Sequence, residues 1–273
     1  MNWTALKIAL EDIPIWQLRA LTCILAGSGL LVIARLAGHR IALAGPIFRP
    51  IVVGALFNVT GWNVLSAYGV SLISSSEAVM IAYTMPVWAT LLGVIILGER
   101  LGPRTVMALV LGTAGVVLLV LEGGLGELGR APWGAIATLA AAMVWAGGIV
   151  FQKRNAWPLP VIVMAGWQLL IGAVPIAIAA FLLEPLAIQA ARPASLLAFA
   201  YVAFVGMIFG YYAWFQIVKR YSASFAAIST VAVPVMGTFS GALLLGEPLG
   251  WRQLLALCCV VGALSLIMTA DHK

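Results

Sequence analysis

The sequence has 273 residues and contains very few charged side chains. Charged residues make up 9% of the chain, whereas hydrophobic residues make up 63%. A soluble domain has roughly 25% charged residues. This chain therefore has too few polar side chains to cover a surface in water, and most of its surface must face lipid.

Histidine and cysteine are also scarce. The chain has two histidines, His39 and His272, and three cysteines that lie in apolar runs, Cys23, Cys258 and Cys259. No cysteine lies near a histidine at a metal-binding spacing, and no paired carboxylates occur at such a spacing. No glycine-rich phosphate loop followed by lysine is present, which argues against pumping driven by ATP. We expect no cofactor, no metal and no enzymatic activity, with a membrane-embedded enzyme as the alternative class of function.

The formal net charge of +6 raises the question of nucleic-acid binding. Nucleic-acid interfaces gather Lys and Arg into a patch or stripe, whereas the basic residues here are scattered between apolar runs. An excess of positive charge is also typical of the cytoplasmic loops of membrane proteins. We therefore expect a lipid bilayer as the partner of this chain, and no nucleic acid.

Nine apolar segments are long enough to span a membrane, which takes about 20 residues per helix. They are residues 15–37, 50–72, 75–97, 104–121, 133–151, 161–183, 196–218, 224–245 and 253–269. A tenth, shorter helix is expected before them, because Trp3 corresponds to Trp145 of the second half but only two residues precede it. The expected fold is an all-α integral membrane protein with ten transmembrane helices, the first one shortened.

The distribution of charge between alternate loops predicts the orientation of these helices. Ten of the fifteen basic residues fall in one set of loops, and seven of the nine acidic residues fall in or beside the other set. Because cytoplasmic loops are rich in Lys and Arg, the first set should be cytoplasmic. Both termini are then cytoplasmic if the short first helix crosses, in a bacterial-type inner membrane.

One stretch of the sequence occurs twice. "TMPVWATLLGVIILGERLG" at 84–102 and "AVPVMGTFSGALLLGEPLG" at 232–250 are identical at nine of nineteen positions, with a constant offset of 148. The segments group as five helices in 1–124 and five in 132–273, and an odd number of crossings inverts the second copy. Inverted repeats are a recurrent architecture of transporters, with the binding site near the midplane. A purely structural or receptor protein gives no reason for such a repeat.

These two copies, together with "WTALKIALEDIPIWQLR" at 3–19, resemble the EamA type of the drug/metabolite transporter superfamily. The resemblance covers nearly the whole chain. It implies two inverted repeats of five helices and a central cavity lined mainly by helices 1, 3, 4, 6, 8 and 9. It also implies transport of small metabolites, among them aromatic amino acids. The shortened first helix is the departure from the family pattern.

Uncharged polar and aromatic side chains gather in the helices that should line this cavity. In lipid, a buried indole or phenol must find a protein partner or a wet cavity. The candidate substrate-binding residues are Trp3, Asn58, Trp62, Tyr68, Tyr83, Trp145, Tyr211, Tyr212 and Ser229. The alternative for each of them is a hydrogen bond that only joins two helices.

Three further residues are candidates for a part in transport. Pro86 and Pro234 are expected in the middle of the fourth and ninth helices, where proline removes a backbone hydrogen bond. We interpret them as kinks that expose carbonyl groups to substrate, with simple packing kinks as the alternative. Glu77 opens the fourth helix and is a candidate for proton coupling, unless it only stabilises the helix N-terminus.

The pattern of charge also bears on the substrate. No charged side chain is expected deep in the nine segments, and the nearest, Lys7 and Arg19, are expected toward the outer side. A charge at the bilayer centre costs about 2.5–3.5 kcal/mol, so a strongly anionic substrate should be matched by a cation there. We expect a secondary transporter that exports small amphipathic metabolites by alternating access, with hydrophobic or aromatic amino acids as the first expectation. Export of cationic aromatic drugs is the alternative, and a homodimer remains open.

The predicted topology can be tested by labelling single introduced cysteines with a membrane-impermeant maleimide. We expect residues 37–48 and 153–158 to react only from the cytoplasmic face, and residues 122–132 only from the outer face. Labelling of both 37–48 and 122–132 from the same face would contradict the inverted repeat.

Overall fold

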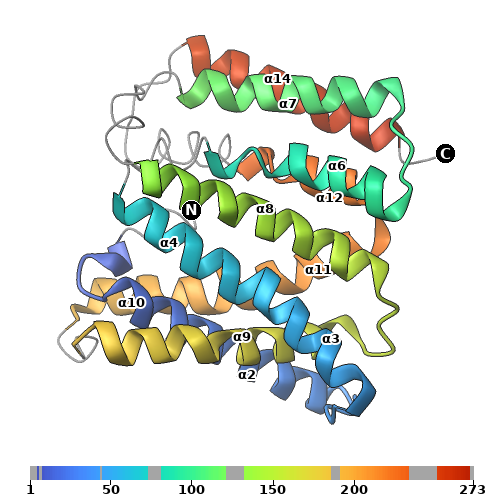
Figure 1. Cartoon of the computed structure of the whole chain (residues 1–273). Coiled ribbons are helices and arrows are strands. Elements are labelled where there is room, and N and C mark those ends of the chain that lie inside the picture. The colour runs from blue at the N-terminus through green and yellow to red at the C-terminus, as the bar shows by residue number, and fades with distance from the viewer. Residues whose placement is uncertain are drawn as a thin grey trace. The chain divides into compact units, whose positions relative to one another are not determined.

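The computed structural model describes residues 5, 8–43, 45–72, 81–120, 132–185, 191–233 and 251–270, and among these it contains helices and no strands (Figure 1). Three candidate residues, Trp3, Glu77 and Pro234, lie outside the described residues. Within these described ranges, five stretches of helix are long and apolar enough to cross a membrane. They are Ile15–Leu36, Gly45–Gly69, Pro132–Arg154, Val161–Leu183 and Pro193–Arg220.

The helices form two compact units, each of which combines both halves of the sequence. Unit 1 comprises Met1–Asn63 and Asn155–Lys219, and unit 2 comprises Val64–Arg154 and Arg220–Lys273. The elements of unit 1 are α2 (Ile15–Leu36), α3 (Gly45–Ala55), η1 (Leu56–Gly61), α9 (Val161–Leu183), α10 (Pro193–Tyr201), η3 (Val202–Phe209) and α11 (Gly210–Arg220). Those of unit 2 are α4 (Trp62–Leu72), which begins at the boundary, α6 (Met85–Leu97), α7 (Pro103–Val120), α8 (Pro132–Arg154), α12 (Ala223–Ser229) and α14 (Trp251–Ala270).

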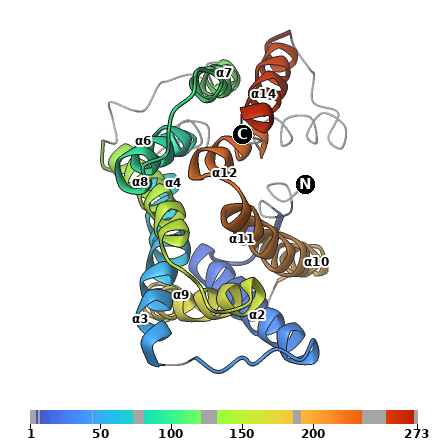
Figure 2. The same ribbon diagram turned by 90° about the vertical axis from the view of Figure 1, so that its right-hand side faces the viewer.

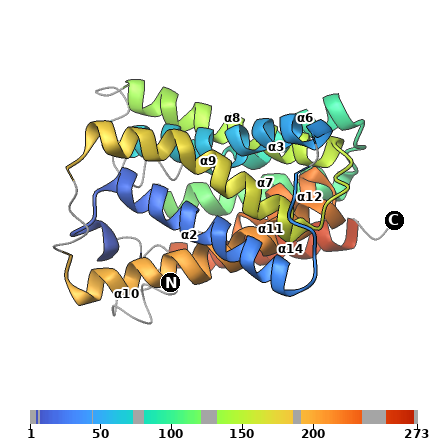
Figure 3. The same cartoon turned by 90° about the horizontal axis from the view of Figure 1, so that it is seen from below.

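In unit 1, α2 and α9 pack along each other at a pair of glycines (Figure 3). A Cβ atom added to Gly27 would lie 2.9 Å from the carbonyl oxygen of Gly166, and one added to Gly166 would lie 3.1 Å from that of Gly27. Small residues let helix backbones approach closely in lipid, where hydrophobicity does not drive helices together. This glycine pair therefore sets the distance between the two helices.

Two segments of unit 1 are π-helical, namely η1 at Leu56–Gly61 and η3 at Val202–Phe209. Adding the offset of 148 to residues 56–61 gives residues 204–209, which lie within η3. The unusual helix geometry thus recurs at the offset of the sequence repeat. Single π-helical turns are rare and are frequent at functional sites.

In unit 2, α7 and α14 lie side by side, and α6 packs against α8 and α12 (Figure 2). Ala108 of α7, Ile228 of α12 and Ala263 of α14 are all fully buried in one cluster. Large apolar side chains cover the outside of both units, such as Leu36 and Phe181, each 83% exposed. Such a surface is suited to lipid and not to water.

The chain segment before α2 is fastened to the start of α10 by polar contacts. Arg192 donates from Nε to Asp12 Oδ2 at 2.9 Å and from Nη2 to Glu11 at 2.7 Å. The Ser195 hydroxyl donates to Asp12 Oδ2 at 2.6 Å and also lies 3.1 Å from the carbonyl oxygen of Ile8. This network holds the first described helical residues on α10.

The same network generates a pH-dependent prediction. Hydrogen bonds from Arg192 and then Ser195 lower the pKa of Asp12 from 3.8 to about 2. Because the pKa is lower in the folded chain, the ionised carboxylate adds stability above pH 3.8, and this stability is lost as the pH falls toward 2. We expect Ser195→Ala to lower the melting temperature in detergent at pH 7. The deficit should shrink as the pH falls from 3.8 to 2.

The control is Ser265→Ala, because Ser265 lies on the exposed side of α14, far from Asp12 in the sequence, and its hydroxyl bonds the carbonyl of Val261 in its own helix. It should melt like the unmodified protein at every pH. A deficit of Ser195→Ala that is independent of pH would show that Asp12 does not carry the effect.

Candidate functional site

A buried cluster of polar side chains surrounds the π-helix η1 in unit 1. Asn58 is only 1% exposed, and its amide Nδ2 donates to Oε1 of the fully buried Gln168 on α9 at 3.1 Å. The main-chain oxygen of Asn58 accepts from the Tyr211 hydroxyl on α11 at 3.3 Å, and Tyr211 also bonds the side chain of Asn63. Gly54 makes room for Gln168, because an added Cβ would lie 2.7 Å from its Nε2 atom.

Asn58 and Arg19 in unit 1 each have a buried polar atom with no hydrogen-bond partner among the described residues. These atoms are Oδ1 of Asn58 and Nε of Arg19, which lies in the second turn of α2. The Arg19 side chain is within electrostatic range of Tyr211 and of Cys23, one turn further along α2. Arg19 is therefore a neighbour of the same polar cluster.

Arg19 and Gln168 belong to this neighbourhood, although neither is among the candidates predicted from the sequence. Arg19 is more enclosed than expected, because its Nε atom is buried inside the unit and not turned to the outer surface. A signal was present in the spacing, since Arg19, Cys23 and Leu30 follow the helical period on one side of α2, and the latter two are buried. The hydropathy of a segment does not show that a charged side chain lies on the buried side of its helix.

The structure brings together only some of the predicted site residues in unit 1. Asn58 and Tyr211 contact each other, and Trp62 is half-buried at the start of α4. Tyr212 is 37% exposed, and its hydroxyl accepts from Gln216 Nε2 at 2.9 Å within the same helix. The Tyr212 hydroxyl therefore bonds within α11 and, among the described residues, not to the cluster at η1.

The remaining described candidates belong to unit 2. Tyr83 is buried with 8% exposure, Trp145 on α8 is half-buried, and Tyr68 on α4 is 51% exposed. The Ser229 hydroxyl donates to the carbonyl oxygen of Ala226 at 2.7 Å, within its own helix. Tyr83 and Trp145 are thus the candidates of unit 2 that are turned inward.

Pro86 does not lie in the middle of a helix, contrary to the sequence-based expectation. Helix α6 begins at Met85, so Pro86 is in its first turn, where its missing N–H group leaves no gap in the helix. The interruption is a turn at Tyr83 and Thr84. The Thr84 hydroxyl donates to the carbonyl of Ile81 at 2.6 Å, and the Thr84 amide bonds the same carbonyl at 3.1 Å, so that this turn is closed by local hydrogen bonds.

The repeated "GE" pair has a structural explanation in its first copy. Gly98 ends α6 with φ 68°, and the amide of Glu99 bonds back to the carbonyl of Gly93 at 3.2 Å, the arrangement of a Schellman motif. The Glu99 carboxylate then accepts from the amide of Ala223 at 2.6 Å and from the hydroxyl of Ser224 at 2.9 Å. It thereby caps the start of α12, in the other half of the sequence.

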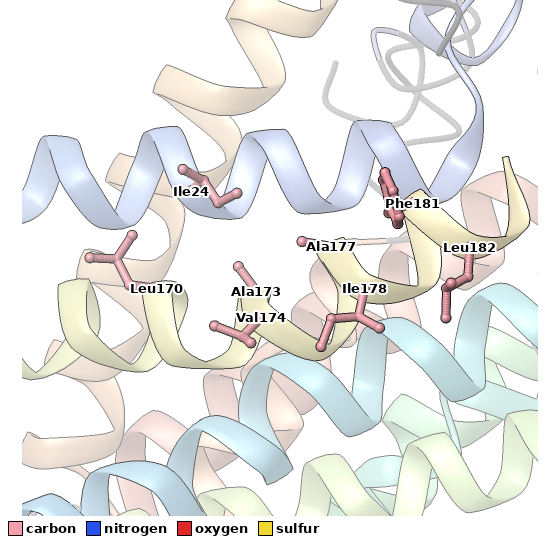
Figure 4. A pocket seen from close by; sticks show the side chains of 8 residues that line it. All are labelled: Ile24, Leu170, Ala173, Val174, Ala177, Ile178, Phe181 and Leu182. Atoms are coloured by element: carbon pink, nitrogen blue, oxygen red, sulfur yellow. The ribbon is translucent and has the colours of Figure 1, made fainter. Parts of the chain in front are cut away.

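An apolar groove of about 370 Å³ lies between α2 and α9 (Figure 4). Its lining consists of Ile24, Leu170, Ala173, Val174, Ala177, Ile178, Phe181 and Leu182. It contains none of the polar candidates, and Phe181 in its wall is largely exposed. We interpret this groove as a lipid-facing surface, distinct from the polar cluster at η1.

The fold and the polar cluster define a class of protein: a helical membrane protein with a buried polar site. Among the described residues, no three His, Cys, Asp or Glu side chains are grouped to hold a metal. A family model described as "EamA-like transporter family" matches residues 1–121 and 132–269. The chain belongs to this family, which confirms the resemblance seen in the sequence.

Relatives of known name are also transporters. "Uncharacterized transporter YoaV" of Bacillus subtilis (strain 168) is 24% identical over 94% of this chain and 89% of its own length. "Uncharacterized inner membrane transporter YedA" of Escherichia coli (strain K12) is 27% identical over 99% of this chain and 87% of its own length. A protein of the same strain named "Probable amino-acid metabolite efflux pump" is 29% identical over 81% of this chain and 83% of its own length. These names belong to transporters and not to enzymes.

One solved structure has the same fold, with a TM-score of 0.87 and 23% sequence identity. The match covers 99% of this chain and 94% of the other chain. At this level of identity the likeness establishes the fold alone.

The cap on α12 generates a stability prediction. Removing the carboxylate in Glu99→Ala should lower the free energy of unfolding by about 2 kcal/mol, because several backbone and hydroxyl donors lose an ionised acceptor. Ser224→Ala removes only one of these donors and should cost less. Arg100→Ala, at the exposed neighbouring position, is the control and should be neutral. Equal melting temperatures for the three variants in detergent would contradict the capping role of Glu99.

Proposed function

We propose that the protein is a secondary transporter that exports small amphipathic metabolites, with hydrophobic or aromatic amino acids as the leading substrates. It works by alternating access between two inverted repeats, residues 1–124 and 132–273, with ten transmembrane helices. Both termini face the cytoplasm of a bacterial-type inner membrane. The proposed partners are the small-molecule substrate and the lipid bilayer. The proposal also allows for assembly as a homodimer.

The observation that carries this proposal is the polar cluster around η1. Asn58, Gln168 and Tyr211 are polar groups inside a unit whose outer surface is apolar. Buried polar groups in a membrane protein are costly, and they mark substrate or ion pathways more often than other positions do. Amide and phenol groups suit a solute that has both polar and apolar parts.

Two further observations support export of amino acids. The chain belongs to a transporter family, and one relative is named as an amino-acid metabolite efflux pump. Tyr83 and Trp145 supply inward-turned aromatic rings in unit 2. Aromatic rings pack well against apolar and aromatic side chains. Export of cationic drugs is disfavoured by Arg19, since its guanidinium, whose Nε atom is buried, would repel a positively charged solute.

The proposal can be tested with the purified chain in proteoliposomes. We expect counterflow of phenylalanine and leucine above the level of protein-free liposomes, and no comparable flux of glucose 6-phosphate. Measurement with and without a pH gradient separates proton coupling from facilitated diffusion. Sugar-phosphate flux in preference to amino-acid flux would contradict the proposal.

Tyr83→Ala provides a sharper test of the site. Loss of a buried ring contact worth about 1.4 kcal/mol should reduce phenylalanine flux about tenfold. Tyr221→Ala is the matched control, because Tyr221 is 39% exposed and is not a site candidate. Both variants must first show the melting behaviour of a folded protein. Unchanged flux in Tyr83→Ala would remove Tyr83 from the site.

A further inference from the structure

The buried atoms of Arg19 and Asn58 that have no hydrogen-bond partner among the described residues differ in hydrogen-bonding character. The Nε atom of Arg19 is a donor that carries part of a permanent positive charge, and Oδ1 of Asn58 is an acceptor. Leaving such groups buried and unpaired destabilises a protein. A cost of this kind is explained if a ligand supplies the missing partners.

The described structure offers Arg19 no counter-ion. Each acidic residue that the structure describes is committed to another contact. Glu11 and Asp12 bind Arg192, Glu99 caps α12, and Glu184 accepts from the amides of Trp16 and Gln17 at 3.0 and 2.9 Å. A cation in a membrane-spanning helix is expected to meet an anion or a polar pathway. Arg19 therefore remains open to an anionic group of a ligand.

Asn58 is held in the orientation that leaves its oxygen free. Its Nδ2 group is occupied by Oε1 of Gln168 at 3.1 Å, so that Oδ1 is the atom available to a ligand. Tyr211 connects the two groups, because its hydroxyl bonds the main-chain oxygen of Asn58 and it lies within electrostatic range of Arg19. Donor and acceptor thus belong to one neighbourhood of unit 1.

We propose that Arg19 and Asn58 recognise the two charged groups of a zwitterionic α-amino acid. The guanidinium of Arg19 binds the carboxylate, and Oδ1 of Asn58 accepts from the ammonium group. This inference rests on the proposed export function and narrows its substrate class. The protein selects solutes that carry both groups, and a solute that lacks either of them leaves one buried atom unpaired.

Three compounds with the same phenyl side chain separate the two contacts: phenylalanine, phenethylamine, which lacks the carboxylate, and 3-phenylpropionate, which lacks the ammonium group. We expect phenylalanine to be transported about tenfold or more faster than either analogue, since each loses a charge-assisted hydrogen bond. In detergent, phenylalanine should raise the melting temperature of the unmodified protein, and the analogues should not. The second measurement requires no variant.

Variants then assign each contact to its residue. Arg19→Gln should reduce phenylalanine transport about tenfold or more and leave phenethylamine transport unchanged or raised. Asn58→Asp should raise phenethylamine transport, because a carboxylate attracts the ammonium group more strongly. Arg35→Gln, in the exposed last turn of the same helix, is the matched control and should behave like the unmodified protein.

The outcomes separate the failure of the zwitterion site from that of the export function. Equal transport of phenylalanine and phenethylamine, or normal phenylalanine transport by Arg19→Gln, overturns the zwitterion site and leaves export intact. Absence of transport for every compound tested overturns the proposed function. In that case equal thermal stabilisation by all three compounds, or by none, overturns the zwitterion site as well.

Discussion

Every backbone N–H group at the start of a helix needs an acceptor, and lipid supplies none. Two carboxylates meet this requirement across the sequence. Glu184, just after α9, binds the amides of Trp16 and Gln17 at the start of α2. Glu99, just after α6, caps the start of α12. In both cases the acceptor and the helix that it caps come from different halves of the chain. Each unit is therefore closed by a contact that joins the two halves.

The same requirement explains how unit 1 tolerates irregular helix geometry. The π-helix η1 is followed by α4 without an exposed backbone gap, because the Asn58 carbonyl receives the Tyr211 hydroxyl. The Thr60 hydroxyl in turn donates to the carbonyl of Gly172 on α9 at 2.9 Å. A neighbouring helix thus supplies a donor to the distorted segment, and the segment supplies a donor to a carbonyl of α9. A polar cluster at this place is a consequence of the distortion and is also available to a solute.

The sequence predicted the class of fold and part of the site, and its failures have physical causes. Apolar runs identify membrane helices because length and hydropathy are properties of a segment alone. The helix break near Pro86 was misplaced, since the sequence marks the proline and not the preceding turn at Tyr83 and Thr84. Tyr211 and Tyr212 are adjacent and look alike in the sequence. Only packing determines that Tyr211 bonds η1 and Tyr212 bonds its own helix.

Arg19 changes the argument about which charges the site accepts. Without an enclosed cation, the sequence favoured solutes that carry no strong negative charge. With the Nε atom of Arg19 and the amide oxygen of Asn58 unpartnered among the described residues, the neighbourhood matches one negative and one positive group. A sugar phosphate brings close to two negative charges, so that a single arginine would leave about one charge uncompensated in a medium where that is expensive. An amine without a carboxylate carries a positive charge, which the guanidinium of Arg19 repels. A solute with both charges and no net charge is the one that leaves neither buried group unpaired, and its side chain can then be apolar.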